Sequence, residues 1–306
     1  MKRFLTLALA LILILSTAAA SAQTLQIAAP DDATNLARAI KLLETAGFIE
    51  VDPAAGYSPE IKDITNYIYD IEVVPVAANT LTSTLTDYAG AVINGTWATT
   101  VGLIPSKDGL IVEQQAEGGE NPYVNILVAR TEDADNEIYQ KIVDAYHTQL
   151  VAEFMLLEYN EAYYPAFEYE TDPALVINAD NVAALKDYYY NVASPAGKTV
   201  VKVGVCGTKN DMFAAVQWLL DQENAGIYIE LVVLDNYNLP NDALNNRVAK
   251  DLDLNAFQHK AYLAKEMASF GYDLTVIADT LIAPLTLYSN NYASIDAIKD
   301  AAGLMK

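Results

Sequence analysis

Apolar runs of strand length alternate with segments of helical spacing along this chain of 306 residues, and that alternation restricts the folds open to it. Buried strands are expected at residues 25–30, 71–78, 91–94, 122–130, 199–206, 227–235, 252–257 and 274–279. Helices are expected at residues 31–44, 81–90, 136–159, 210–222, 262–270 and 294–302. Because a strand–helix–strand order places helices on the faces of a sheet, the pattern predicts an α/β protein with mainly parallel sheets.

Three of these helices are predicted in more detail. Asp32 or Thr34 stands at the N-cap of the first helix, and Ser294 caps the last helix, which ends at Gly303. Residues 136–159 are read as one long amphipathic helix. The side chains that share its apolar face are Ile138, Ile142, Tyr146, Leu150 and Phe154.

Residues 1–22 have the layout of a secretory signal peptide, with cleavage expected after Ala22. Lys2 and Arg3 form a short basic region, which an apolar run and an AxA-type cleavage site follow. The apolar run is shorter than the roughly 20 residues that a membrane-spanning helix needs. We therefore expect a protein that is exported to the periplasm or secreted.

The chain carries a formal net charge of −22 at pH 7, which bounds its partners. Phosphate groups would be repelled, so nucleic acid is not an expected partner, and neither is an anionic membrane surface. Cys206 is the single cysteine, so no intrachain disulfide can form. Its thiol is expected to be a small buried apolar group rather than a reactive one.

No set of catalytic residues is visible in the sequence. Only two histidines are present, His147 and His259, and neither belongs to a metal-binding or nucleophile motif. Scattered carboxylates in an acidic chain are better explained as a solvated surface. The sequence therefore predicts a protein that is not an enzyme and that needs no metal or other cofactor.

Five short motifs carry a resemblance to one family. They read PDDATNLARAIKLLE at residues 30–44, AVINGTW at 91–97, PYVNILVAR at 122–130, NAFQHKAYL at 255–263 and PLTLYS at 284–289. In these stretches the chain resembles the methionine-binding lipoproteins that supply ABC importers. The resemblance implies a periplasmic-binding-protein fold of the type II-like class, with two lobes and a ligand cleft between them.

The order of the motifs departs from that family. In the family, the FQH and LYS motifs come first, whereas here they follow the other three. Residues 164–167 resemble the end of a family member, and residues 202–205 resemble its beginning. The resemblance therefore implies a circular permutant in which residues 168–198 link the former ends.

The permuted order also assigns residues to lobes. The first lobe is expected to contain residues 24–120 and 291–306, and the second lobe residues 121–290, with the linker 168–198 on its surface. The segments at the two ends of the mature chain are contiguous in the family. Leu25 is therefore expected within about 15 Å of Ala302, the distance that a few extended residues span.

The resemblance also implies the residues that bind the ligand. Arg38 is expected to pair with the carboxylate of an amino acid, for which a guanidinium is well suited. Asn125 is expected to orient the charged end of the ligand from the other lobe. Asn94 either faces the ligand or bonds its own backbone at a strand end. The remaining expected contacts are Asn35, Tyr237, Phe257, His259, Tyr262 and Tyr288.

Alternation along a strand would place Phe257 and His259 on the same face, toward the ligand. The implied function is the capture of methionine, or of a related amino acid or methionine-containing dipeptide, by a monomer that delivers it to an ABC importer permease. An exported sensor or interaction protein on the same scaffold is the alternative. The feature that favours the alternative is the absence of a cysteine after the signal, where this family is normally lipidated.

Overall fold

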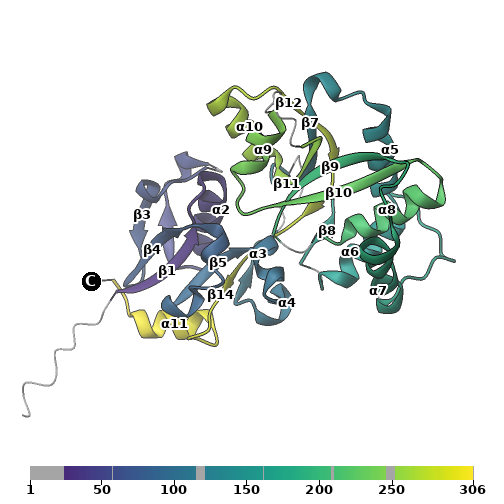
Figure 1. The fold of residues 1–306 in the computed structure, drawn as a ribbon. Helices are drawn as coiled ribbons and strands as arrows, with labels where there is room; N and C mark the ends of the chain where they lie inside the picture. The colour runs from purple at the N-terminus through teal and green to yellow at the C-terminus, as the bar shows by residue number, and fades with distance from the viewer. Residues whose placement is uncertain are drawn as a thin grey trace, which may run out of the picture.

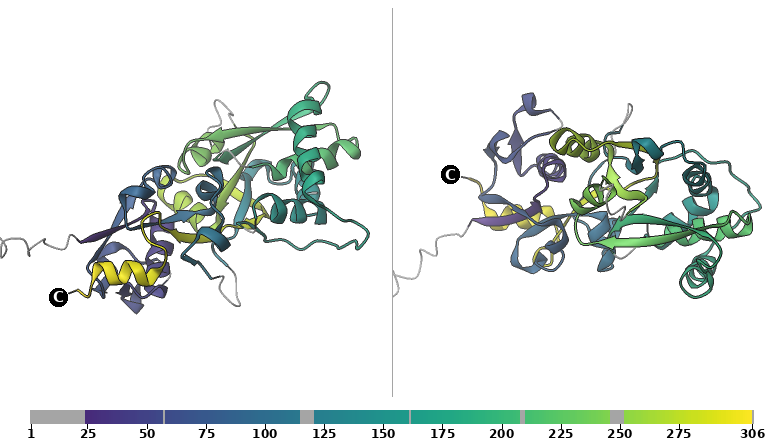
Figure 2. Two further views of the ribbon diagram at one scale, coloured as in Figure 1. Left: turned by 90° about the horizontal axis from the view of Figure 1, so that it is seen from below. Right: turned by 45° about the horizontal axis from the view of Figure 1, so that its top comes forward.

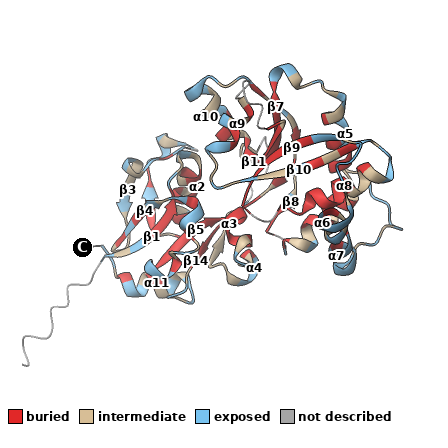
Figure 3. Ribbon diagram, in the orientation of Figure 1, coloured by how far each residue is buried: buried red, intermediate tan, exposed pale blue. Residues whose placement is uncertain are grey.

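The computed structural model describes residues 24–56, 58–114, 121–160, 162–207, 210–245 and 252–305. The predicted signal peptide lies outside these residues. The chain forms two lobes, each built around a five-stranded mixed sheet (Figure 1). This is the α/β, two-lobed architecture that the sequence predicted. The strands form the buried centre of each lobe, while the outer faces of the helices are exposed (Figure 3).

The first sheet has the strand order β4-β1-β5-β14-β6. Its strands are β1 (Leu25–Pro30), β4 (Ile71–Val76), β5 (Gly90–Asn94), β6 (Ile111–Val112) and β14 (Leu285–Tyr288). The strands β2 (Ile49–Val51) and β3 (Ile64–Tyr67) form a separate hairpin. Strand β14 was placed in the second lobe by the sequence interpretation. Its pairing with β5 instead puts it in the first sheet.

The second sheet has the strand order β10-β9-β11-β7-β12. Its strands are β7 (Asn125–Arg130), β9 (Thr199–Cys206), β10 (Ile227–Leu234), β11 (Leu254–His259) and β12 (Leu274–Asp279). A two-stranded ribbon of β8 (Tyr164–Pro165) and β13 (Leu281–Ile282) lies beside it. Cys206, at the end of β9, is 1% exposed, and burial raises the pKa of its thiol to about 12, as expected for a structural cysteine.

Helices cover both faces of each sheet. The first lobe contains α2 (Ala33–Thr45), α3 (Gly95–Thr100), α4 (Pro105–Asp108) and α11 (Ile295–Ala302). The second lobe contains α5 (Glu137–Tyr146), α6 (Gln149–Glu158), α7 (Ala179–Asp187), α8 (Met212–Gln222), α9 (Leu239–Asn245) and α10 (Lys260–Phe270). Apolar side chains of α5, α6, α7 and α8 pack on one face of the second sheet, and those of α9 and α10 pack on the other.

The sheets are mixed rather than mainly parallel, and the path of the chain explains why. The chain passes between the lobes twice, from β6 to β7 and from β12 to β14. The two strands that follow these crossings, β7 and β14, pair antiparallel with their neighbours β11 and β5. Strands that are instead connected through helices within one lobe remain parallel, as β1 is to β4 and β9 is to β10.

Most of the expected elements are confirmed, and two are wrong. Residues 81–90 contain only a short 3₁₀ turn, Leu85–Asp87, in place of a helix. The single long helix expected at 136–159 is two helices, because the backbone leaves the helical region at His147 and Thr148. The caps are as predicted: the Asp32 side chain accepts a bond from the Asn35 amide, and Ser294 accepts one from Ala297.

The two ends of the described chain lie together on the first lobe (Figure 2). The amide of Leu25 donates to the carbonyl of Asp70 at 3.1 Å, and the amide of Asp70 donates to the carbonyl of Gly303 at 2.9 Å. Leu304 forms an isolated bridge with Tyr69. Leu25 and the end of α11 therefore flank the same residue, which agrees with the expected proximity.

Residues 168–198, the expected linker, pack on the second lobe. They contain α7 and the π-helix η6 (Tyr188–Val192). Val182 and Leu185 of α7 join the main core of that lobe. The hydroxyl of Tyr189 donates to the carbonyl of Ile229 at 2.9 Å, which attaches η6 to the edge strand β10. This segment is a docked part of the fold.

Buried hydrogen bonds of Arg130 stabilise the second lobe, and this can be tested by substitution. Its side chain is 2% exposed and donates to the carbonyls of Leu244 and Leu252 and to Asp133. Replacing it with alanine leaves two buried carbonyls unsatisfied, so Arg130→Ala should lower the free energy of unfolding by about 3 kcal/mol. Urea denaturation measures this. Lys62→Ala, at an exposed position, is the control and should leave the urea midpoint of the unaltered protein unchanged. Equal midpoints for the two variants would contradict the stabilising role of the Arg130 hydrogen bonds.

Candidate functional site

A cavity lies between the two lobes, where both sheets present strand ends. Its empty volume is about 380 Å³, including the mouth. Its walls are Asn35, Arg38, Asn94, Thr96, Asn125, Tyr237, Gln258, His259, Tyr262 and Ala283. Seven of the nine residues expected at a ligand site from the sequence are therefore brought together.

Arg38 lies one turn into α2 and is 4% exposed. Its Nη1 donates to Oδ1 of Asn35 at 3.0 Å, and its Nη2 donates to the carbonyl of Ala283 at 3.1 Å. The guanidinium also lies 4.7 Å from the ring centre of Tyr123, a cation–π distance. These contacts come from both lobes, since Tyr123 lies two residues before β7. The side chain is therefore fixed in position at the cavity wall.

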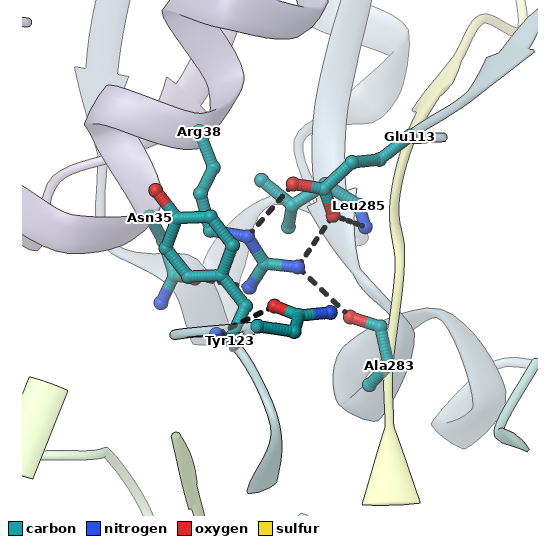
Figure 4. Close-up of polar contacts among 7 residues, drawn as sticks. Asn35, Arg38, Glu113, Tyr123, Ala283 and Leu285 are labelled. Atoms are coloured by element: carbon teal, nitrogen blue, oxygen red, sulfur yellow. Dashed lines mark hydrogen bonds and ion pairs between the residues drawn. The ribbon is translucent and has the colours of Figure 1, made fainter. Parts of the chain in front are cut away.

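Glu113 is the charge partner of Arg38 (Figure 4). Its Oε1 accepts from Nε at 3.0 Å and its Oε2 accepts from Nη2, giving a two-pronged ion pair. Oε2 also accepts from the amide of Leu285 at 3.0 Å. With Asn35 and Ala283, this pair occupies four of the five guanidinium N–H groups, which leaves one on Nη1. Arg38 is thus neutralised within the protein and does not present an open fork.

His259 lies at the end of β11 and caps helix α10. Its Nδ1 accepts from the amide of Tyr262 at 3.1 Å, so in the neutral ring the proton is on Nε2. Burial, with a smaller contribution from the positive charge of Arg38, lowers the pKa of His259 well below its usual value. Nε2 is buried and has no partner among the described residues. The ring therefore offers one N–H donor at the cavity.

The three asparagines of the cavity wall differ in the hydrogen-bonding groups that they can offer a ligand. Asn35 is committed, because it donates to Asp32 and accepts from Arg38. Asn94 caps α3 without a side-chain capping bond, and its buried Oδ1 has no partner among the described residues. Asn125 is the register partner of His259 across β7 and β11. The cavity thus has an unused acceptor in one lobe and an unused donor in the other.

Of the aromatic residues expected at the ligand site, two line the cavity and one does not. Tyr237 and Tyr262 line the cavity, and the hydroxyl of Tyr262 donates to Oδ1 of Asn238 at 2.6 Å. Tyr288 is 1% exposed and packs with Ala28, Ile93 and other residues of the first lobe, away from the cavity wall. Phe257 belongs to β11, and its side chain lies outside the described residues.

Several cavity residues were missed by the sequence interpretation. Gln258 and His259 are consecutive, yet both line the cavity, which strict alternation would forbid. Both residues stand at the end of β11, where the strand meets the cavity, and the register shift lies before them, between Asn255 and Gln258. That shift places Asn255 and Gln258 on one face, where both donate to Oδ1 of Asn241. Thr96 lay in a recognised motif and could have been found there. Glu113 had no local signal, since it is 75 residues from Arg38.

The described residues contain no group of three or more histidine, cysteine, aspartate or glutamate side chains suited to a metal ion. Within the same residues, no helix is long and apolar enough to cross a membrane. The described cavity wall offers a ligand the neutralised Arg38 guanidinium, one unused N–H donor on His259, one unused acceptor on Asn94 and aromatic rings.

Comparison with known proteins gives the family. The profile of the NlpA lipoprotein family matches residues 19–167 and 201–305. This protein belongs to the NlpA lipoprotein family. The unmatched residues between the two blocks coincide closely with the expected linker. The agreement of both blocks with the motifs supports the recognition made from the sequence.

Individual relatives match over shorter spans. D-methionine-binding lipoprotein MetQ of Yersinia pestis is 39% identical over 128 residues, 41% of this chain and 46% of the relative. MetQ of Escherichia coli K12 is 38% identical over 130 residues, 42% of this chain and 46% of the relative. A nutrient-binding protein from Burkholderia cenocepacia, solved bound to methionine, aligns over 45% of this chain and 57% of its own at 26% identity and a TM-score of 0.40. The matches thus span about half of the curated relatives.

The neutral ring of His259 predicts a dependence of stability on pH. The pKa of this ring is lowered in the folded protein, so the unfolded chain takes up a proton first as the pH falls. The stabilisation is complete above the unfolded value of about 6.5 and is lost as the pH falls toward the folded value, by up to about 1.4 kcal/mol per pH unit. The free energies of unfolding of the unaltered protein and of His259→Gln, measured with urea, should therefore converge as the pH is lowered from 7 to 5. Free energies that fall in parallel with pH in the two proteins would contradict this prediction.

Proposed function

We propose that this protein is a substrate-binding protein that captures methionine, or a closely related amino acid or methionine-containing dipeptide, for an ABC importer. The observation that carries the proposal is the cavity wall itself. It combines a fixed arginine–glutamate pair with an unused N–H donor on His259 and an unused acceptor on Asn94. A zwitterionic ligand has a carboxylate that can accept from Arg38 and His259, and an ammonium group that can donate to Asn94.

The polarity of the wall suits a zwitterion better than a simple anion. Glu113 already balances the charge of Arg38, so an isolated anion would gain little net charge attraction. A ligand carboxylate can accept from the remaining Nη1–H of Arg38 and from Nε2–H of His259. A ligand ammonium can donate to Oδ1 of Asn94. Tyr237 and Tyr262 provide the ring surfaces that favour a thioether side chain.

The relatives support the same ligand class. The MetQ proteins of Yersinia pestis and Escherichia coli K12, which match at 39% and 38% identity, are named D-methionine-binding lipoproteins. The family profile matches residues 19–167 and 201–305, and these include the cavity wall. Delivery to an importer permease, action as a monomer and export through the signal at residues 1–22 belong to the same proposal. So does closure of the two lobes on the ligand by movement at the two crossings.

We further propose that the chain is a circular permutant of this family. The motifs occur in reversed block order, and the family match is interrupted at residues 168–200. The ends of the described chain both bond Asp70, so a covalent connection there would need only a few residues. On this view, residues 168–198 replace the former chain ends on the second lobe.

Binding is tested by calorimetry with L-methionine and D-methionine. Arg38→Lys keeps a positive charge beside Glu113 but loses the planar fork, so the affinity should fall at least about tenfold. Asn125→Ala should also weaken binding several-fold. Lys41→Ala, at a partly exposed position of the same helix, is the control and should bind like the unaltered protein. Absence of methionine binding by the unaltered protein would overturn the proposed ligand.

The permutation is tested by restoring the family order. Residue 305 is joined to residue 24 through a short glycine–serine linker, and the chain is opened in the exposed segment between Pro195 and Ala196. The rearranged protein should keep the circular dichroism spectrum and the methionine affinity of the original. A protein that unfolds on this rearrangement would contradict the permuted relationship.

A further inference from the structure

A second groove lies on the outer side of the second lobe, where the linker meets the edge strand β10. Its empty volume is about 690 Å³. Its walls are Tyr189, Tyr190, Asn210, Tyr228, Glu230, Leu231 and Val233. It shares no residue with the cavity between the lobes. In Figure 1, β10 forms the edge of the second sheet above α7 and α8.

Tyrosine rings dominate this groove. The rings of Tyr189 and Tyr190 meet nearly edge to face, with centres 5.0 Å apart and planes at 77°. The rings of Tyr189 and Tyr228 are nearly parallel, with centres 6.4 Å apart and planes at 9°. The three rings thus border one groove in two orientations. The negative faces of aromatic rings attract cations.

Two of the hydroxyls are bonded within the protein. Tyr189 donates to the carbonyl of Ile229 at 2.9 Å, and Tyr190 donates to Oδ1 of Asp211. Burial raises the pKa of Tyr189 to about 12, so its phenol remains neutral at physiological pH. These bonds fix the rings and use up both O–H donors. Tyr190, which is 58% exposed, therefore offers a ligand its ring surface, while Tyr189 is 7% exposed and packs against the neighbouring rings.

Apart from the hydroxyl of Tyr228, which can donate or accept, the side-chain polar groups left to a ligand in the groove are acceptors. Glu230 is the only charged residue among its described walls. Asn210 is 3% exposed and donates through Nδ2 to the carbonyls of Cys206 and Gly207. Its buried Oδ1 has no partner among the described residues. A carboxylate and an unused amide oxygen beside aromatic faces favour a cationic ligand over an anionic one.

We propose that this groove binds a small organic ammonium ion, a ligand distinct from the one captured between the lobes. Tyr189 and Tyr190 lie in the part of the chain that the family profile does not match. The groove therefore depends on the linker of this chain. The proposal does not rest on methionine binding, because the two sites have no residue in common.

The test compares choline with its neutral isostere, 3,3-dimethylbutan-1-ol, by proton NMR titration of the full-length protein. Choline should bind at least about tenfold more tightly, because only it carries the charge that ring faces and Glu230 attract. Its methyl resonances should shift upfield, as expected for groups held over aromatic rings. Equal binding of the two compounds, or no binding of choline, would overturn the proposal.

Substitutions in the groove test whether choline binds there. Tyr190→Ala should weaken choline binding about tenfold, whereas Tyr190→Phe, which keeps the ring, should not. Glu230→Gln should weaken it several-fold, and Glu223→Gln, an exposed glutamate outside the groove, is the matched control. Thermal melts confirm folding. Choline affinity that is unchanged in Tyr190→Ala and Glu230→Gln, or lost on adding excess methionine, would place binding elsewhere and overturn the proposal.

Discussion

The ion pair between Arg38 and Glu113 joins the parts of the protein on which the site depends. Glu113 directly follows β6, where the chain leaves the first lobe, and it also accepts from Leu285, where the chain has returned. Arg38 bonds Ala283 on that returning segment. Both crossings are therefore attached to one helix of the first lobe. A buried pair of this kind contributes less to stability than to a defined geometry, because desolvation offsets the attraction.

The α/β architecture could be predicted from the apolar pattern, and most of the cavity wall from the resemblance to the family, and a physical signal accompanies two of the wall residues. Strands that end at the cleft carry a polar residue immediately after or before a buried apolar run, as Asn94 and Asn125 do. A buried polar side chain in such a place needs a partner or a ligand, so local sequence marks it. Arg38 was assigned to the ligand only through the resemblance of its motif to the family, because a single arginine on an amphipathic helix is typical of a solvated face. These signals lie within single motifs and survive any change of motif order.

The features that were missed depend on more than one segment. Glu113 becomes a site residue only through a partner 75 positions away. The bulge in β11 arises from pairing with β7, and it brings Asn255 and Gln258 together on Asn241. The break at His147 and Thr148 contains neither glycine nor proline, and the ring of His147 bonds the carbonyl of Asp279 instead. In each case tertiary contacts overrode a regular local pattern.

Sheet pairing makes the reversed motif order physically acceptable. Each sheet is held by hydrogen bonds between neighbouring strands and by side chains packed on its faces, and neither depends on which strand is synthesised first. Chain order matters where covalent connections must close, and there the distances are short: Leu25 and Gly303 both bond Asp70. The connection at residues 168–198 need only span the surface of one lobe. Because it forms a helix that buries Val182 and Leu185, it also adds packed surface that a bare chain end would lack.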